Sequence, residues 1–215
     1  MAWARKGAPE GSLVVAEQQI SARARPRRPW PSGGEKSVAL TLIVRPHIAP
    51  VLGGILHIAA TAGVADAFGP NSEVEWPDEV YVGETVVGLV SVHIEQTVRG
   101  LEWALINVML PEVAPPRAMG LARVVQAVER RYQQPLDELI EEWEPRCRTI
   151  GRSVVARLYP IGRDRRVSGH AVGVGPTGAL TIEDELGLER GIRPHELATW
   201  EGSEGQLGVS GPGGG

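Results

Sequence analysis

Residues 51–68, VLGGILHIAATAGVADAF, constrain the fold most strongly. The segment is long and rich in alanine and leucine, and its apolar residues recur at helical spacing. A helix that is apolar around most of its surface has to be buried. Its glycines, Gly53, Gly54 and Gly63, are expected to permit close packing against a sheet. We therefore expect a buried central helix with strands packed around it.

Short apolar runs on both sides of this helix predict strands. They are rich in β-branched residues and are bounded by glycine, proline and short turns. The predicted strands cover residues 11–16, 38–44, 73–76, 79–82, 85–94 and 101–109. Two further helices are predicted at residues 119–131 and 136–143. This mixture predicts the α+β class, with a mixed or mostly antiparallel sheet and packed helices.

After Gly151 the pattern changes to short strands that are separated by glycine-containing turns. This pattern is typical of a small β-barrel of about 50 residues. The predicted strands cover residues 153–159, 166–174, 179–182 and 191–197. We therefore expect three parts along the chain: a larger domain at 1–148, the barrel at 149–201, and a glycine-rich tail at 202–215 that is disordered.

Composition excludes several classes of protein. The formal net charge of −4 argues against a general nucleic-acid binder. The single cysteine, Cys147, excludes an internal disulfide, and the histidines share no metal-ligand spacing. No run is expected to reach the roughly 18 apolar residues of a membrane span, and no signal peptide is recognisable. We expect a cytoplasmic protein that binds neither nucleic acid nor membrane.

One predicted loop is dense in arginine. Residues 16–32, AEQQISARARPRRPWPS, lie between the first two predicted strands, and four arginines at 23–28 are followed by Trp30. Guanidinium groups beside an aromatic plane suit a phosphate or carboxylate ligand. The alternative is a solvated charge run, or ion pairs that anchor the loop.

This loop and four further motifs, in the same order, resemble the biotin protein ligase family from Gly7 to about Trp200. The family's GRGRxGRxW loop is similar to ARARPRRPW at 22–30, and its KWPND motif to EWPDE at 75–79. Its GxGIN strand is similar to WALIN at 103–107. A glycine-containing strand and a C-terminal glycine pattern are similar to residues 86–91 and 151–180. The resemblance implies a catalytic core followed by an SH3-like barrel.

The resemblance also implies an activity and a set of site residues. Biotin and ATP, with Mg²⁺, would give biotinyl-adenylate, which a lysine of a biotin carrier domain attacks. Asp78 and Glu79 are the implied Mg²⁺ ligands, with a solvated turn as the alternative. For Trp76 and Trp103, core packing is favoured over ligand contact. The implied biotin and adenylate positions are Gln19, Arg23, Arg25, Arg28, Trp30, Trp76, Gly88 and Asn107.

The sequence departs from the family motifs at positions that carry charge or backbone freedom. Ala22 and Ala24 replace loop glycines, and an added Cβ disfavours a positive φ by about 1–2 kcal/mol. Glu75 and Thr85 stand at the positions of two family lysines, and Trp103 replaces a glycine. The family's opening strand and its Ser-Thr-Asn turn have no counterpart, so the sequence is expected to begin after them.

Two functions are therefore left open. The chain is either a biotin protein ligase whose activity is very low or absent, with no residue assigned as catalytic, or a non-catalytic relative. Such a relative would keep the fold and bind biotin, a nucleotide or a carrier domain. The residues do not distinguish biotin from a related acyl acid such as lipoate, and they leave the oligomeric state open.

Overall fold

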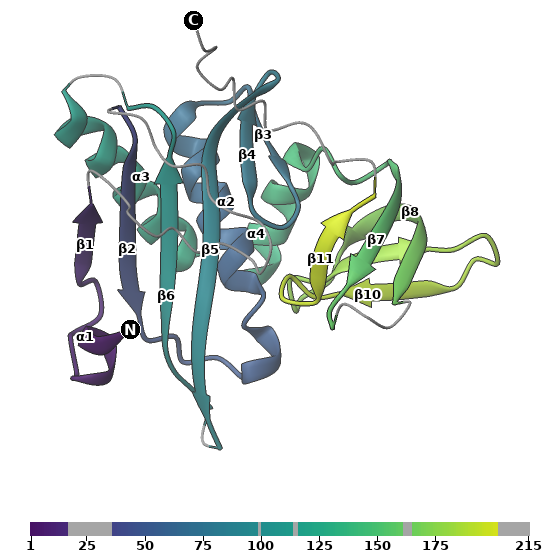
Figure 1. Ribbon diagram of the computed structural model, residues 1–215, viewed down its shortest axis with the longest axis horizontal. Coiled ribbons are helices and arrows are strands. Elements are labelled where there is room, and N and C mark those ends of the chain that lie inside the picture. Colours follow the sequence, from purple (N-terminus) through teal and green to yellow (C-terminus); the bar gives the residue numbers. More distant parts are fainter. Residues whose placement is uncertain (17–35, 99, 114–115, 161–164, 202–215) are drawn as a thin grey trace, which may run out of the picture.

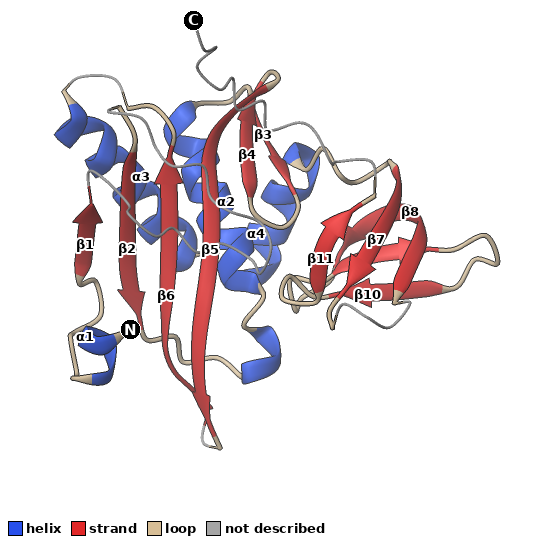
Figure 2. Ribbon diagram, viewed as in Figure 1, coloured by secondary structure: helices blue, strands red, loops and turns tan. Residues whose placement is uncertain are grey.

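The computed structural model describes residues 1–16, 36–98, 100–113, 116–160 and 165–201. They form two antiparallel sheets and a set of helices (Figure 1). The larger helices all lie on one side of the larger sheet, as Figure 2 makes clear. The α+β class predicted from the sequence is therefore confirmed.

The larger sheet has six strands in the order β1-β2-β6-β5-β4-β3, and every pairing within it is antiparallel. The four strands that follow the central helix, β3-β4-β5-β6, pair in sequence order as a meander. The six strands are β1 (Leu13–Ala16), β2 (Val38–Val44), β3 (Ser72–Glu75), β4 (Glu79–Val82), β5 (Thr85–Thr97) and β6 (Gly100–Leu110).

The helices come from four parts of the chain. The short N-terminal helix α1 had no signal in the sequence, whereas the three longer helices lie where they were predicted. The helices are α1 (Ala2–Arg5), η1 (Pro50–Leu52), α2 (Ile55–Phe68), α3 (Arg117–Tyr132), α4 (Leu136–Trp143) and η2 (Glu144–Arg146).

Helix α2 is buried on most sides, as its composition predicts, but two of its glycines do not contact the sheet. A Cβ on Gly63 would lie 2.4 Å from Cα of Val128 in α3. A Cβ on Gly54 would lie 2.2 Å from the carbonyl oxygen of Thr177. The expectation that these glycines pack on a sheet is therefore wrong for both. The sequence of a helix that is apolar around most of its surface predicts that other elements pack closely on it. It does not predict which element packs on which side.

The expectation that no segment is long and apolar enough to span a membrane also needs correction. Residues Pro50–Phe68 pass that test by length and composition. The alanines, leucines, isoleucines and valines of this window raise its mean hydropathy to 1.6. More than half of the window, 56%, is buried inside the protein. A core helix of a soluble protein passes the same test, so the result is weak evidence for a membrane span.

The second sheet has five strands in the order β10-β9-β8-β7-β11. The strand predicted at 191–197 is two strands, because the turn between them contains Pro194, which has no amide hydrogen for a ladder. The sheet is compatible with the predicted SH3-like barrel. Its strands are β7 (Ser153–Leu158), β8 (Arg166–Val174), β9 (Leu180–Glu183), β10 (Glu189–Ile192) and β11 (Leu197–Trp200).

The two sheets meet at Trp76, which is fully buried. Its indole N–H donates to the carbonyl oxygen of Gly178 at 3.1 Å, and its ring centroid lies 6.1 Å from that of Trp200. The main apolar core contains residues from both sheets. The division at residue 148 stays a prediction, and the predicted tail at 202–215 lies outside the described residues.

Candidate functional site

The two faces of the larger sheet differ, because successive side chains of a strand point to opposite sides. Even-numbered residues of β2, from Val38 to Val44, lie in the main core together with α2. Odd-numbered residues of β2 therefore point away from the helices, and the strand register extends this assignment to β6 and β5. We call the side away from α2, α3 and α4 the distal face.

A row of three polar side chains crosses the middle of the distal face. Thr41 in β2, Asn107 in β6 and Ser91 in β5 are direct neighbours in the register. The Thr41 hydroxyl donates to Oδ1 of Asn107 at 2.8 Å. Nδ2 of Asn107 donates to the carbonyl and hydroxyl oxygens of Ser91, each at 3.3 Å. Asn107 is therefore oriented from both sides, while all three residues stay partly exposed.

Buried apolar rows flank this polar row on the distal face. Ala39, Met109 and Leu89 lie on one side, and Ile43 and Leu105 lie on the other. Among the described residues at the centre of this face, accessible polar atoms therefore concentrate in the Thr41–Asn107–Ser91 row. Of the side chains that the sequence analysis assigned to a ligand, Asn107 is the one found there.

Five of the predicted site residues, Gln19, Arg23, Arg25, Arg28 and Trp30, lie outside the described residues. The segment that carries them, 17–35, joins β1 to β2. Its first described neighbour, Ala16, pairs with Ala39, one row away from the polar row. The last described residue before this segment therefore lies one row away from the polar row.

The structure does not bring Trp76 and Gly88 to this row. Trp76 is in the core at the junction of the two sheets, which agrees with the core packing favoured from the sequence. A Cβ on Gly88 would lie 2.6 Å from a methyl carbon of Val64, so this glycine lets β5 approach α2. Both lie on the helix side of the sheet, and a ligand role for either stays a prediction.

Trp103 is on the distal face but is also buried, at 1% exposure. It forms a small separate core with Ala4, Ile43 and Leu105. Its ring lies 5.7 Å from that of His93 in β5. Core packing, favoured for Trp103 from the sequence, is thus what the structure displays, although the packing partner is the unexpected helix α1.

The alternative that Asp78 and Glu79 form a solvated turn is wrong, because they are 6% and 2% exposed. The amide of Val90 donates to the carbonyl oxygen of Asp78 at 2.8 Å, which folds the hairpin onto β5. The Tyr81 hydroxyl donates to Glu79 at 2.5 Å. Within the described ranges, no group of three or more His, Cys, Asp or Glu side chains could hold a metal ion. A Mg²⁺ role for the two carboxylates stays a prediction.

Arg148 is a cation that the sequence analysis missed. Its guanidinium lies 4.4 Å from the centroid of the Tyr81 ring, and its side chain is 12% exposed. Nε lies 3.9 Å from the Glu75 carboxylate, and Nη2 lies 3.5 Å from that of Glu84. Glu75 stands at a position where the family motif has a lysine, so a negative charge replaces a positive one. That negative charge is paired with Arg148. No local pattern links Arg148 to residues more than sixty positions away.

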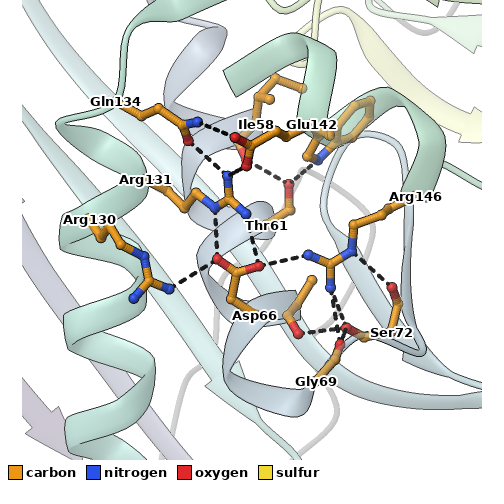
Figure 3. Close-up of polar contacts among 12 residues, drawn as sticks. Ile58, Thr61, Asp66, Gly69, Ser72, Arg130, Arg131, Gln134, Glu142 and Arg146 are labelled. Carbon is orange, nitrogen blue, oxygen red and sulfur yellow. Dashed lines mark hydrogen bonds and ion pairs between the residues drawn. The ribbon is translucent and has the colours of Figure 1, made fainter. Parts of the chain in front are cut away.

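A second polar cluster lies on the helix side of the sheet, around Asp66 at the end of α2 (Figure 3). Arg131 donates to both carboxylate oxygens of Asp66, Arg146 donates at 2.7 Å and Arg130 at 3.2 Å. Arg131 also donates to Glu142. Burial opposes ionisation of Asp66, but the hydrogen bonds from Arg131 and Arg146 outweigh it and hold its pKa below the ordinary value.

This cluster borders an open pocket of about 960 Å³ on the helix side. Three arginines and three acidic residues line the pocket, so their formal charges balance. Arg146 also donates to the Gly69 and Ser72 carbonyls and to the Ser72 hydroxyl. The best donors of the pocket are thus engaged within the protein. We interpret the cluster as a clamp between α2, α3 and α4.

No protein-family model matches the chain. Two curated proteins do: the bifunctional ligase/repressor BirA of Bacillus subtilis (strain 168) is 26% identical, and that of Bacillus spizizenii is 27% identical. Each alignment covers 221 residues, 87% of this chain and 66% of the relative. The chain therefore spans just under two thirds of the length of these relatives.

Solved structures share the fold. Biotin protein ligase from Aquifex aeolicus, in complex with biotin and ATP, gives a TM-score of 0.69 at 17% identity and 92% coverage of both chains. Biotin acetyl coenzyme A carboxylase synthetase from Helicobacter pylori, with bound biotinylated ATP, gives 0.60 at 13% identity, covering 89% of this chain and 91% of that one. A biotin protein ligase-like protein of unknown function from Silicibacter gives 0.62 at 15%, covering 90% and 87%.

These likenesses define the class, since the chain has the fold of a biotin protein ligase in both its sheets and its helices. The sequence similarity to the two BirA proteins and the shared fold together support the likeness to the biotin protein ligase family that the motifs predicted.

Proposed function

We propose that the chain is a biotin protein ligase-type protein that binds biotin and ATP at the distal face and has very low or no ligase activity. The observation that carries the proposal is the placement of Asn107. This residue matches the asparagine of the family's GxGIN strand, and it is held in a partly exposed polar row. Ala16, the last described residue before the arginine-rich segment, pairs one row away from it.

In the proposed reaction, a carboxylate oxygen of biotin attacks the α-phosphorus of ATP, and pyrophosphate leaves. The amine of an acceptor lysine on a biotin carrier domain then attacks the carbonyl carbon of the adenylate, and AMP leaves. The first step brings two anions together, which requires fixed positive charge and oriented donors. We assign this role to Arg23, Arg25 and Arg28, with Gln19 and Trp30 completing the site.

The proposal of low activity rests on the charges near Glu75. The nearest cation, Arg148, is engaged by Glu75 and Glu84, so the family's lysine charge has no free replacement among the described residues of this hairpin. A lost contact to a buried charge costs about 2–5 kcal/mol. A lost donor to a developing negative charge slows a reaction by roughly 10²–10³.

The remaining proposals concern Mg²⁺, the partner and the location. Mg²⁺ in nucleotide sites is usually bound by one or two carboxylates beside the phosphates, which matches the number offered by Asp78 and Glu79. The hydrogen bond from the Tyr81 hydroxyl to the Glu79 carboxylate would have to break before Glu79 could bind a metal ion through that oxygen. A biotin carrier domain is the proposed protein partner, and the cytoplasm is the proposed location.

The second candidate is a non-catalytic relative that binds biotin, a nucleotide or a carrier domain. The observation that favours it is the burial of Trp103 and Leu105, which stand at the two glycine positions of the GxGIN strand. The side chains of Trp103 and Leu105 therefore occupy space on the distal face that the glycines of the family motif leave empty. Such a protein could keep a docking role without forming an adenylate.

Calorimetry tests the proposed function, first with biotin and then with biotin plus ATP. We expect biotin to bind and ATP to strengthen the binding. Replacing Asn107 with alanine should weaken binding about tenfold, because one to two hydrogen bonds to the oriented amide are lost. Asn71→Ala, at an exposed asparagine in the turn before β3, is the matched control and should bind like the wild type.

Biotin-dependent exchange between ATP and pyrophosphate tests the catalytic half. We expect exchange far below that of an active ligase measured alongside. Exchange at ordinary ligase rates would refute the low activity. Absence of binding by both biotin and ATP would instead refute the ligand site, and binding of a biotin carrier domain alone would favour the non-catalytic candidate.

A further inference from the structure

The N-terminal segment at residues 2–8, which we call the strap, covers part of the distal face. Ala4 in α1 is 2% exposed and packs on Trp103, Ile43 and Leu105, and Ala8 adds a partly buried contact. The strap thereby excludes solvent from the distal side of Trp103, Ile43 and Leu105. Trp103 is thus buried on one side by the sheet and on the other by a four-residue helix.

Arg45 at the end of β2 holds the strap in place. It donates to the Ala4 carbonyl at 3.1 Å and to the Ala8 carbonyl at 2.9 Å, and also reaches the Glu102 carbonyl at 3.3 Å. Among the described residues, a long ion pair between Arg5 and Glu95, at 3.5 Å, is the other side-chain link from the strap to the sheet. The strap is therefore tied to the sheet mainly through one side chain.

The strap is weakly held for the area that it covers. Its apolar contact consists of two alanine side chains, whereas its largest side chain, Trp3, is 64% exposed. A helix of four residues has almost no stability of its own. Segments with few buried apolar contacts open locally at low free-energy cost while the rest of the protein stays folded. The strap can therefore undock without global unfolding.

The covered patch is continuous with the candidate site. Trp103 and Asn107 are on the same strand and the same face, four residues apart, which corresponds to about 13 Å along the strand. Leu105 lies between them and is part of the covered patch. An acyl adenylate is longer than this distance, so such a ligand that is bound at Asn107 and extends along β6 toward Trp103 reaches this patch.

We propose that the strap is a latch and Trp103 the gate of the candidate site. With the strap docked, Trp103 is fixed between Ala4 and the sheet and closes this end of the distal face. When the strap leaves, the Trp103 ring loses its outer contact and can swing into solvent, which opens the distal face beyond Leu105 on the strand that carries Asn107. This inference rests on the proposed function, because it concerns access of biotin to the same site.

Two substitutions in one helix test the latch. Ala4→Glu places a carboxylate against Trp103 and Ile43 and should undock the strap, because a buried unpaired charge is costly. Ala2→Glu makes the same change at an exposed position of α1 and is the matched control. Arg45→Ala provides a second route to undocking, since it removes the donors to the Ala4 and Ala8 carbonyls.

Hydrogen exchange of residues 1–11 reports strap docking, and calorimetry with biotin reports access. We expect Ala4→Glu and Arg45→Ala to lose protection in this segment and to bind biotin at least about tenfold more tightly than the wild type. That gain follows because the open state is a minor population, of about 10% or less, when the strap is docked. Ala2→Glu should match the wild type in both measurements.

Three results would overturn the latch. If the wild type binds biotin and the undocked variants bind it no more tightly, the role of Trp103 as a gate is refuted. The proposed function is not affected by that result. Undocked variants and wild type that all fail to bind biotin would refute the proposed function as well. Protection at residues 1–11 that persists in both variants would mean that the strap does not open, and the latch would be wrong.

Discussion

Asp66 connects more charged side chains than any other acidic residue within the described ranges. Its carboxylate, 15% exposed, accepts hydrogen bonds from Arg130 and Arg131 of helix α3 and from Arg146 of a 3₁₀ turn. The bond to Asp66 also raises the pKa of Arg131 above its ordinary value. Such a carboxylate is invisible to sequence reasoning, because its partners are more than sixty positions away.

Asp66→Ala should lower the free energy of unfolding by about 3 kcal/mol, since it leaves the half-buried Arg131 and Arg146 without their shared anion. Urea unfolding monitored by circular dichroism measures this difference. Glu129→Ala, an exposed carboxylate on the rim of the same pocket, is the control and should change stability little. Equal effects of the two substitutions would contradict the clamp.

The pH dependence follows from the lowered pKa of Asp66. Because the native pKa lies below the unfolded value of about 3.9, its stabilisation is complete above that value and declines as pH falls toward the native pKa. The wild type should therefore lose stability more steeply than Asp66→Ala between about pH 4 and pH 2. Parallel losses in both proteins would argue against the assignment.

At the scale of elements, the contact between α2 and α3 depends on a missing side chain. Gly63 lets the backbone of α3 approach at Val128, where a Cβ would meet Cα at 2.4 Å and the amide nitrogen at 2.6 Å. The sequence predicted both helices and even the close packing of this glycine. It could not tell which element would approach, because α2 is apolar on most of its sides.

Gly63→Ala should destabilise the protein by at least about 1–3 kcal/mol, because the obstacle is helix backbone and not a flexible side chain. Gly120→Ala in α3 is the matched control. Its Cβ would meet only a Val113 methyl carbon at 3.0 Å, and alanine favours a helix by about 1 kcal/mol over glycine. Thermal unfolding should place Gly63→Ala well below the wild type and Gly120→Ala near or above it.

At the scale of the whole molecule, a tight backbone contact joins the β8–β9 turn of the second sheet to the start of helix α2. Gly178 has a φ of +74°, and a Cβ there would lie 2.4 Å from the backbone of Gly54 at the start of α2. The indole N–H of Trp76 donates to the carbonyl oxygen of Gly178. Since one apolar core includes residues of both sheets, we expect them to unfold in a single transition.

Gly178→Ala and Gly187→Ala separate this contact from simple backbone strain. Both glycines have a φ of +74°, but a Cβ on Gly187 meets nothing within 4 Å. Gly187→Ala should cost about 1–2 kcal/mol through strain alone. Gly178→Ala should cost about 1–3 kcal/mol more, because the two sheets have to move apart. Calorimetric unfolding measures both, and two separate transitions in the wild type would contradict the shared core.

Local patterns in the sequence predicted the fold class and most of the elements correctly, because apolar periodicity and turn residues act over a few neighbouring positions. Local motifs also predicted the likeness to biotin protein ligases, and they made Asn107 a candidate site residue. The contacts of Trp103 with the strap, of Arg148 with Glu75, and of Asp66 with three arginines became visible in the tertiary structure. These contacts join residues far apart in the chain, and their energies depend on burial and distance, which no local pattern encodes.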